Sequence, residues 1–206
     1  GQRIEVGAGV SFMKKFFPDT IVTDIKPAKH LDRVLDALEM DVPSQSVRAI
    51  YGINCFHHFP DIPKFFSEMN RVLAPGGGIV LIDPYYGPLS SILYPVLFSS
   101  ETFDKTHPDW KSQPEVKGVM TGANQALSYI VFKRDRKKFE QLFPQFEIVM
   151  HKSYGNYLRY LVSGGLNFYQ LIPNWLMPAV RLVEFAFTPI QHLFALHHVI
   201  VLRKKS

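Results

Sequence analysis

The residues at the start of the chain have types and spacing suited to binding a charged small molecule. Glu5, Gly7 and Gly9 stand at the end of an apolar, strand-like run and just before a helix-like segment. Glycines at such a turn let the backbone approach a ligand closely, and a helix N-terminus offers free N–H groups. Glu5 is suited to accept a positively charged amino group of an amino-acid-like ligand. Phe12 replaces the third glycine of a dinucleotide fingerprint, which disfavours a pyrophosphate site and leaves an ordinary tight turn as the alternative.

A second acidic residue, Asp24, ends the next strand-like run, 17 residues after Gly7. A carboxylate at this place can accept hydrogen bonds from the two ribose hydroxyls of an adenosine, whichever adenosine-containing cofactor is bound. The competing interpretation is that Asp24 caps a helix beginning at Ile25.

Two further polar groups follow later strand-like runs. His57 and His58 come after the fourth run, at the edge of a sheet where α/β proteins bind ligands, and are the best candidates for a base. We prefer His58, with helix capping or packing as the alternative for either histidine. Asp83 precedes Tyr85 and Tyr86 after the fifth run, and both tyrosines are candidate substrate contacts, with packing as the alternative.

The sequence predicts no metal site. His57 and His58 are adjacent, as are His197 and His198, whereas ligands on one helix face are three or four residues apart. No cluster of cysteines accompanies either pair.

The elements that would position these residues alternate between strands and helices, as in a doubly wound α/β fold. Strands are expected at 4–6, 20–24, 33–37, 47–53, 78–82, 146–151 and 195–202. The clearest helix starts after Asp61, carries apolar residues at helical spacing and is stopped by Pro75-Gly76-Gly77. We therefore expect a Rossmann-like, mostly parallel seven-stranded sheet, with an insertion at 85–127 and a helical subregion at 157–190.

The 206 residues, 47% of them hydrophobic, suffice for one core, so residues 1–206 are expected to form a single domain. One cysteine, Cys55, and no charged-then-apolar leader favour a cytoplasmic protein. The net charge of +5 is partly local, which disfavours nucleic acid as a partner. Prolines and polar residues interrupt the charge-poor stretches 160–180 and 185–202, so these predict an apolar lid, a homodimer face or a lipid-contacting surface rather than a transmembrane span.

Three motifs between residues 4 and 84 resemble class I S-adenosyl-L-methionine (SAM)-dependent methyltransferases of the methyltransferase type 11 kind. Residues 36–50 align without gaps on the family pattern Asp-Ala-x-x-Leu-Pro-Phe-Pro-Asp-Asn-Ser-Phe-Asp-x-Ile. Phe56-His57-His58-Phe59 is similar to Leu-His-His-Phe, and residues 68–77 are similar to Glu-x-x-Arg-Val-Leu-Lys-Pro-Gly-Gly. The chain departs from the family at Ser11, where a glycine is frequent, and at Arg48, where an acid is frequent.

The resemblance implies SAM as the cofactor and methyl transfer as the activity. It implies that the first loop holds the methionine part, that Asp24 holds the ribose, and that Asp36 and Ala37 lie against adenine. The full set of implied cofactor contacts is Glu5, Gly7, Ala8, Gly9, Asp24, Ile25, Asp36, Ala37 and Ile53.

The later part of the chain is similar to a bacterial subgroup of such enzymes linked to cell-surface polysaccharide or lipid pathways. The residues that carry this likeness are in 101–104, Trp110, 122–127, 132–136 and 160–166. The acceptor is accordingly expected to be a small molecule, a glycan or a lipid, methylated at oxygen. The alternatives are a SAM-fold protein that binds without catalysis, and an NAD-dependent oxidoreductase, which Phe12 in place of the third glycine disfavours.

Overall fold

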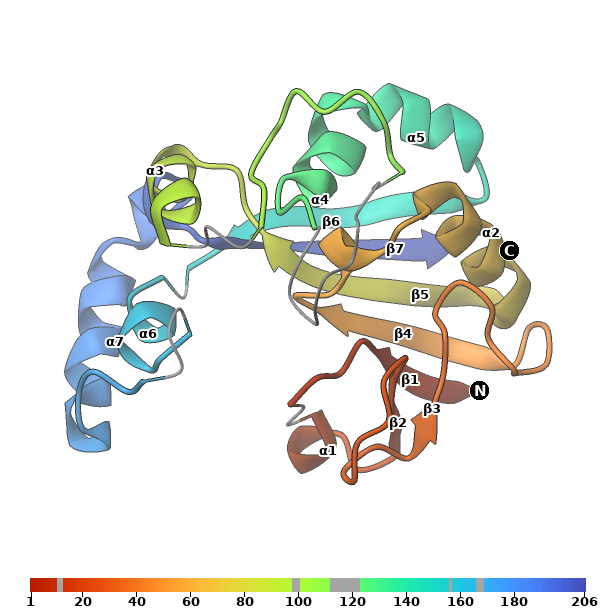
Figure 1. Cartoon of the computed structure of the whole chain (residues 1–206), viewed down its shortest axis with the longest axis horizontal. Helices are drawn as coiled ribbons and strands as arrows, with labels where there is room; N and C mark the ends of the chain where they lie inside the picture. The colour runs from red at the N-terminus through yellow and green to blue at the C-terminus, as the bar shows by residue number, and fades with distance from the viewer. Residues whose placement is uncertain (11–12, 98–100, 112–122, 156, 166–168) are drawn as a thin grey trace.

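The computed structural model describes residues 1–10, 13–97, 101–111, 123–155, 157–165 and 169–206. Its centre is a seven-stranded sheet with the strand order β3-β2-β1-β4-β5-β7-β6 (Figure 1). The strands are β1 (Gln2–Val6), β2 (Thr20–Asp24), β3 (Arg33–Val34), β4 (Val47–Ile53), β5 (Leu73–Pro84), β6 (Phe146–Tyr154) and β7 (His197–Lys204). The first five strands in this order, β3, β2, β1, β4 and β5, pair in parallel with their neighbours. The strand β7 lies between β5 and β6 and is antiparallel to both. The predicted Rossmann-like, mostly parallel sheet is confirmed.

The third strand is shorter than expected. It contains two residues instead of the predicted 33–37, because the chain turns at Asp36 as soon as it leaves the sheet. The Asp36 carboxylate accepts a hydrogen bond from the Leu38 backbone N–H at 2.8 Å, and Asp36 forms an isolated bridge with Glu39. An Asp side chain that satisfies a backbone donor two residues further on stabilises a turn in place of a strand.

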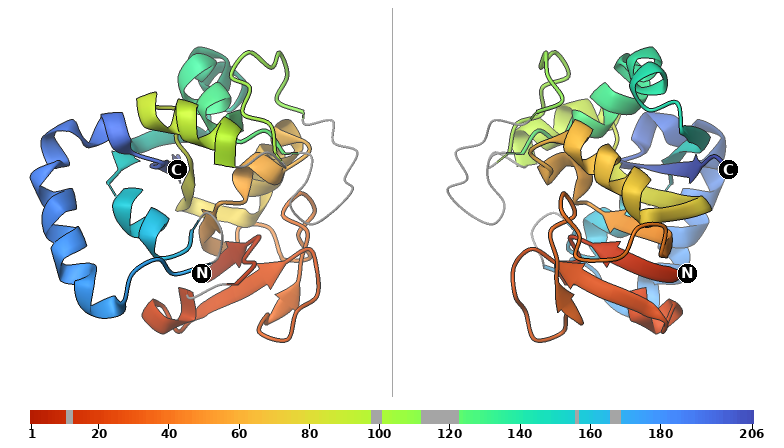
Figure 2. Two further views of the ribbon diagram at one scale, coloured as in Figure 1. Left: turned by 60° about the vertical axis from the view of Figure 1, so that its left-hand side comes forward. Right: turned by 90° about the vertical axis from the view of Figure 1, so that its right-hand side faces the viewer.

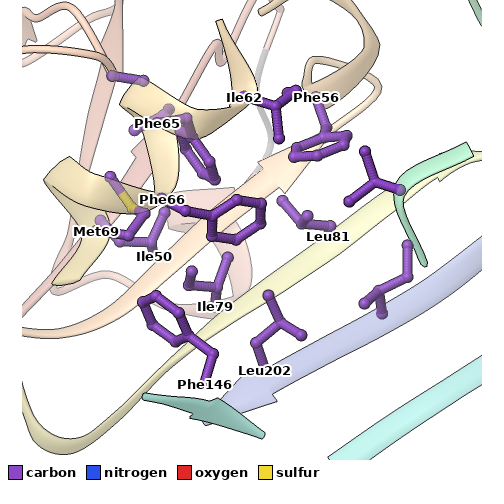
Figure 3. Packing of buried hydrophobic residues seen from close by; sticks show 14 of the residues in the cluster. Ile50, Phe56, Ile62, Phe65, Phe66, Met69, Ile79, Leu81, Phe146 and Leu202 are labelled. Carbon is purple, nitrogen blue, oxygen red and sulfur yellow. The ribbon is translucent and has the colours of Figure 1, made fainter. Parts of the chain in front are cut away.

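Helix α2 (Ile62–Val72) forms as predicted. At its N-terminus the Asp61 carboxylate accepts a hydrogen bond from the Lys64 backbone N–H at 2.9 Å, which satisfies one of the free donors of the first turn. Its apolar stripe includes Phe65, Phe66 and Met69, all 0% exposed, which pack over the sheet (Figure 3). Burying each of these side chains contributes about 1.5–3 kcal/mol, so the stripe anchors α2 to β4 and β5.

A second helical layer covers the same face of the sheet as α2 (Figure 1). It consists of α4 (Leu127–Tyr129), the π-helical turn η2 (Ile130–Arg134) and α5 (Arg136–Leu142). Asp135 occupies the N-cap position of α5, but its side chain makes no capping hydrogen bond. Its carboxylate instead accepts hydrogen bonds from Trp110 Nε1 at 2.9 Å and from Arg134. Asp135 therefore fastens residues 101–111 to the core.

The remaining helices lie near the carboxyl end of β5. They are α3 (Pro88–Leu97), α6 (Tyr157–Val162), η3 (Asn174–Leu176), α7 (Met177–Ala186), η4 (Thr188–Ile190) and α8 (Gln191–Phe194), and the short α1 (Met13–Phe16) follows β1. Tyr94, Tyr157 and Leu196 form a second small core there, and α6 lies beside α7 at one end of the molecule (Figures 1 and 2). Of the helices that the structure describes, none is long and apolar enough to cross a membrane.

Candidate functional site: a cofactor loop beside a buried His–Asp pair

The loop after β1 depends on glycine at two positions for different reasons. Gly7 and Gly9 have φ values of +59° and +50°, in the left-handed region that favours glycine. A Cβ atom on Gly7 would lie 2.6 Å from the Cys55 Cβ, whereas one on Gly9 would meet no atom of the described residues within 4 Å. Gly7 is therefore required by packing, and the space above Gly9 is open to a ligand. Ala8 holds the loop to β2 through its N–H, which donates to the Thr23 carbonyl at 3.0 Å.

Asp24 lies next to this loop. One of its carboxylate oxygens accepts a hydrogen bond from the Gly9 backbone N–H at 2.9 Å, and the other accepts one from the Lys26 N–H at 3.0 Å. Residues 25–31 form no helix, so the interpretation of Asp24 as a helix cap is wrong. Each oxygen of a carboxylate can accept a further bond, and Asp24 is therefore still able to bind hydroxyl groups.

The other predicted cofactor residues come to the same edge of the sheet. Glu5 is 2% exposed at the end of β1, and Ala37 is buried just after β3. Ile25 follows β2 and Ile53 ends β4, the two strands that flank β1, and these side chains expose 62% and 42% of their surface. The edge thus combines glycines with left-handed backbone, carboxylates and exposed apolar side chains. This set suits a ligand such as SAM, which has a charged amino-acid part, a ribose and an apolar base.

A buried histidine–carboxylate pair lies at the ends of β4 and β5. His57 belongs to the turn η1 (Phe56–His58), and Asp83 is near the end of β5. His57 Nδ1 is 2.9 Å from Asp83 Oδ1, and the two side chains are 5% and 0% exposed. Since a carboxylate accepts, His57 donates its Nδ1–H to Asp83, and this orients the ring.

Glu101 completes the cluster from a distant part of the chain. Its Oε2 is 3.6 Å from His57 Nε2, and its Oε1 is 3.5 Å from His58 Nε2. The Gln125 side chain donates a hydrogen bond to Glu101 Oε2 at 2.7 Å. The His58 side chain is 26% exposed and the Glu101 side chain 3%, so His58 presents the cluster to solvent.

Burial and the two carboxylates shift the two histidines in opposite directions. Burial by itself would lower the pKa of His57, but Asp83 and Glu101 outweigh it and raise that pKa to about 9. Burial and the neighbouring His57 lower the pKa of His58 to about 4. Strongly perturbed ionisable groups at a ligand-binding edge mark a candidate functional site.

Cys55 joins the cofactor loop to this cluster. It precedes η1 directly, and its thiol donates a hydrogen bond to the Val6 carbonyl at 3.4 Å. Because Cys55 also packs on Gly7, the loop after β1 and the His57–Asp83 pair are neighbours. The predicted cofactor and catalytic residues are therefore brought to one edge of the sheet.

The two candidate substrate tyrosines differ in their surroundings. Tyr86 stacks on Phe103, with the ring centroids 4.9 Å apart, and also contacts Tyr129. Tyr85 donates its backbone N–H to the Leu196 carbonyl at 2.8 Å. Packing accounts for the position of Tyr86, and a substrate contact by either ring stays a prediction.

Sequence reasoning missed Glu101 as a member of this site. Glu101 belongs to an insertion without a regular pattern, and no signal in the sequence places it beside His57 and His58. Of the two departures from the family pattern, Ser11 lies outside the described residues and Arg48 is exposed on the surface.

The resemblance to class I SAM-dependent methyltransferases stated above is confirmed. Residues 6–81 match a family model described as "Methyltransferase domain". SAM is the cofactor of this class of protein.

Among curated proteins, the chain is similar to ajmaline N-methyltransferase from Rauvolfia serpentina, with 36% identity over 55 residues. The matched segment covers 27% of this chain and 19% of that protein.

Solved structures share the fold over almost the whole chain. A putative methyltransferase from Haloferax volcanii, solved in a complex with the Trm112 activator, has a TM-score of 0.55 at 12% identity, covering 100% of this chain and 83% of that one. A SAM-dependent methyltransferase from Mesorhizobium loti has a TM-score of 0.53 at 11% identity, covering 98% of this chain and 90% of that one. At this level of identity the likeness concerns the fold alone.

Proposed function

We propose that this protein is a SAM-dependent methyltransferase that methylates a hydroxyl oxygen of a small-molecule, glycan or lipid acceptor. The observation that carries the proposal is the contact of Cys55 with Gly7, because it sets the cofactor loop beside the buried His57–Asp83 pair. A cofactor site and an ionisable cluster at one sheet edge are what transfer to a protic acceptor requires.

The cofactor residues divide the ligand between them. Glu5 and the Gly7–Gly9 loop hold the amino-acid part, Asp24 holds the ribose, and Asp36 and Ala37 with the exposed Ile25 and Ile53 line the base. SAM supplies an electrophilic methyl group. The protein's part is to hold the donor and acceptor in line, because alignment alone lowers the barrier of a displacement reaction.

The acceptor lies beside His58, with His57 and His58 as the catalytic residues and Tyr85 and Tyr86 as acceptor contacts. A hydroxyl must lose its proton to become a good nucleophile, whereas a neutral amine needs no such help before it attacks. A cluster of two imidazoles and two carboxylates therefore favours oxygen as the accepting atom.

An apolar surface near this edge favours a lipid or lipid-linked acceptor. Trp175 and Phe185 are each 75% exposed and Leu182 is 68% exposed, in and beside α7. Exposed apolar side chains grouped in this way mark contact surfaces. We propose a cytoplasmic protein that touches a membrane through this surface, with a homodimer through the same surface as the alternative.

Calorimetric titration of the purified chain with SAM, and in parallel with NAD, tests the cofactor. Micromolar SAM binding and no NAD binding are expected. Asp24→Ala should weaken SAM binding at least tenfold, while the exposed control Asp19→Ala should not change it. Equal SAM affinity in the Asp24→Ala variant and the wild type would contradict the assignment of the ribose site.

A second candidate is a protein of this fold that binds SAM without catalysis. The two functions separate in a turnover assay with hydroxyl-containing glycans and lipids as acceptors. For the enzyme, His58→Ala should leave SAM affinity intact and slow methyl transfer, whereas the exposed control His192→Ala should do neither. SAM binding without transfer to any acceptor would favour the binding protein.

A further inference from the structure

We propose that His57, His58 and Glu101 form a binding site for one divalent transition-metal ion of the zinc, manganese or iron kind. One ligand atom from each of His57, His58 and Glu101 lies within 4.8 Å of the other two. Two imidazoles and one carboxylate are a donor set that suits these ions, whereas Mg²⁺ and Ca²⁺ prefer oxygen donors.

The distances within the cluster fit a metal better than they fit hydrogen bonds. Each histidine Nε2 is 3.5–3.6 Å from a Glu101 oxygen, beyond the usual N–H···O range. Ligands about 2.1 Å from a tetrahedral ion are separated from one another by about 3.4 Å. Each nitrogen–oxygen separation is close to this value, His57 facing Glu101 Oε2 and His58 facing Glu101 Oε1.

The groups behind the ligands hold them in the orientation that metal binding needs. The hydrogen bond from His57 Nδ1 to Asp83 turns the Nε2 lone pair toward Glu101, and Gln125 holds the Glu101 carboxylate. A carboxylate on the far nitrogen of a metal-bound histidine fixes its tautomer and raises its basicity.

Among the described residues, the cation that faces both Asp83 and Glu101 when no metal is bound is His57 in its protonated form. Within the described part of the chain, no Lys or Arg lies within 4.0 Å of Asp83 or Glu101. Burying two carboxylates is costly unless a cation compensates them. A divalent ion bound to His57, His58 and Glu101 would replace the Nε2 proton of His57 and add a second positive charge, so that both carboxylates are compensated.

Unsatisfied polar atoms around the cluster are an independent sign of a ligand. Asp83 Oδ2, Gln125 Oε1 and His197 Nδ1 are buried and have no hydrogen-bond partner among the described residues. Asp83 and Gln125 bind members of the proposed ligand set, and His197 pairs with Pro84, the neighbour of Asp83, across β5 and β7. Buried polar atoms are rarely left unpaired, so three in one place indicate that this region accommodates a further polar group, such as a metal-bound water.

Adjacent histidines can serve together here because they belong to the tight turn η1 rather than to an α-helix. Their ring centroids are 4.3 Å apart. The spacing of three or four residues that metal ligands need on an α-helix does not apply to this turn, and Glu101 reaches the pair from a distant part of the chain.

The exposed side of His58 leaves a coordination position open, as in catalytic rather than structural metal sites. This role rests on the proposed function: the ion would bind the acceptor hydroxyl and lower its pKa, so that the proton leaves to water and the oxygen can attack. The acceptor must then carry a hydroxyl group that can coordinate a metal ion.

The test is titration of chelator-treated protein with Zn²⁺ and Mn²⁺ by calorimetry, together with the visible absorption spectrum of the Co²⁺-loaded protein. One ion per chain should bind, and the Co²⁺ bands should be those of a four- or five-coordinate ion. Glu101→Gln keeps the size of the side chain and should weaken binding at least tenfold. Asp83→Asn should weaken it about 10–100-fold, and Glu39→Gln, an exposed carboxylate, is the unchanged control.

Either of two results would overturn the proposal: no stoichiometric binding of any of the three ions, or equal affinity in the wild type and the Glu101→Gln variant. Circular dichroism confirms that each variant is folded. SAM titration of the same samples separates the two proposals, because metal binding without SAM binding refutes the function alone, and SAM binding without metal binding refutes the metal site alone.

Discussion

Replacing Gly7 and Gly9 separately with alanine tests how the loop after β1 is built. Both residues have positive φ values, so alanine at either position adopts a strained left-handed backbone. Only at position 7 does the new Cβ collide, at 2.6 Å from the Cys55 Cβ and 3.2 Å from its Sγ. Both variants therefore bear the cost of a left-handed backbone, and only Gly7→Ala also bears the cost of the collision with Cys55.

The left-handed conformation costs alanine about 1–2 kcal/mol, which is the expected loss of unfolding free energy in Gly9→Ala. In Gly7→Ala the new methyl group also collides with the Cys55 Cβ, which cannot move without moving the backbone. This overpacking should lower the unfolding free energy by about a further 1–3 kcal/mol. Since each kcal/mol shifts Tm by about 2–4 °C in a protein of this size, Gly7→Ala should melt several degrees below Gly9→Ala.

Denaturant unfolding and SAM titration of both variants provide the measurements. Gly9→Ala should keep most of its stability but lose SAM affinity at least tenfold, because its methyl group enters the open space assigned to the cofactor. The double variant Gly7→Ala/Cys55→Gly should recover the unfolding free energy lost to the collision. It should not recover the part lost to the left-handed backbone. Equal midpoints for the two single variants would refute the packing argument, and wild-type SAM affinity in Gly9→Ala would refute the cofactor placement.

Three further variants test the scaffold by denaturant unfolding. Phe66→Ala, at a fully buried site in α2, should cost about 3–5 kcal/mol; a loss below about 1 kcal/mol would contradict the core described here. Asp61→Ala removes the cap on the Lys64 N–H and should cost about 1 kcal/mol, with no change if the cap is not formed in solution. Arg71 holds the pKa of Glu68 below its usual 4.5, so the ionised form stabilises the fold above that pH and this contribution disappears as pH falls through the lowered value. Glu68→Gln should be less stable at pH 7 by about 1 kcal/mol and should converge with the wild type in acid; a difference independent of pH would show that the charge is not responsible.

Much of the first half of the fold could be predicted from local patterns. Asp61 and the helical spacing of the apolar residues after it predict helix α2. Short apolar runs that end in glycine or acidic residues predict the buried parallel strands. The third strand was overestimated because a side chain, Asp36, ends it by binding its own backbone. Propensity alone does not reveal that competition.

The cofactor edge was also accessible from sequence, because Glu5, Asp24 and Asp36 each end or follow a strand. Parallel strands point their carboxyl ends to the same edge, so consecutive strand ends in the sequence become neighbours in space. The prediction that His57 and His58 lie at this edge follows from the same rule, and the structure agrees.

The sequence by itself thus determined the α/β class, the strand ends that gather the cofactor residues and the resemblance to methyltransferases, because these depend on periodicity and local order. Only the tertiary structure decided that Asp83 binds His57 and that Glu101 reaches both histidines. Glu101 comes from an insertion with no regular pattern, and its position is set by long-range packing of Trp110, Gln125 and their neighbours on the core. No local signal encodes such a contact, since it arises only when the whole chain has folded.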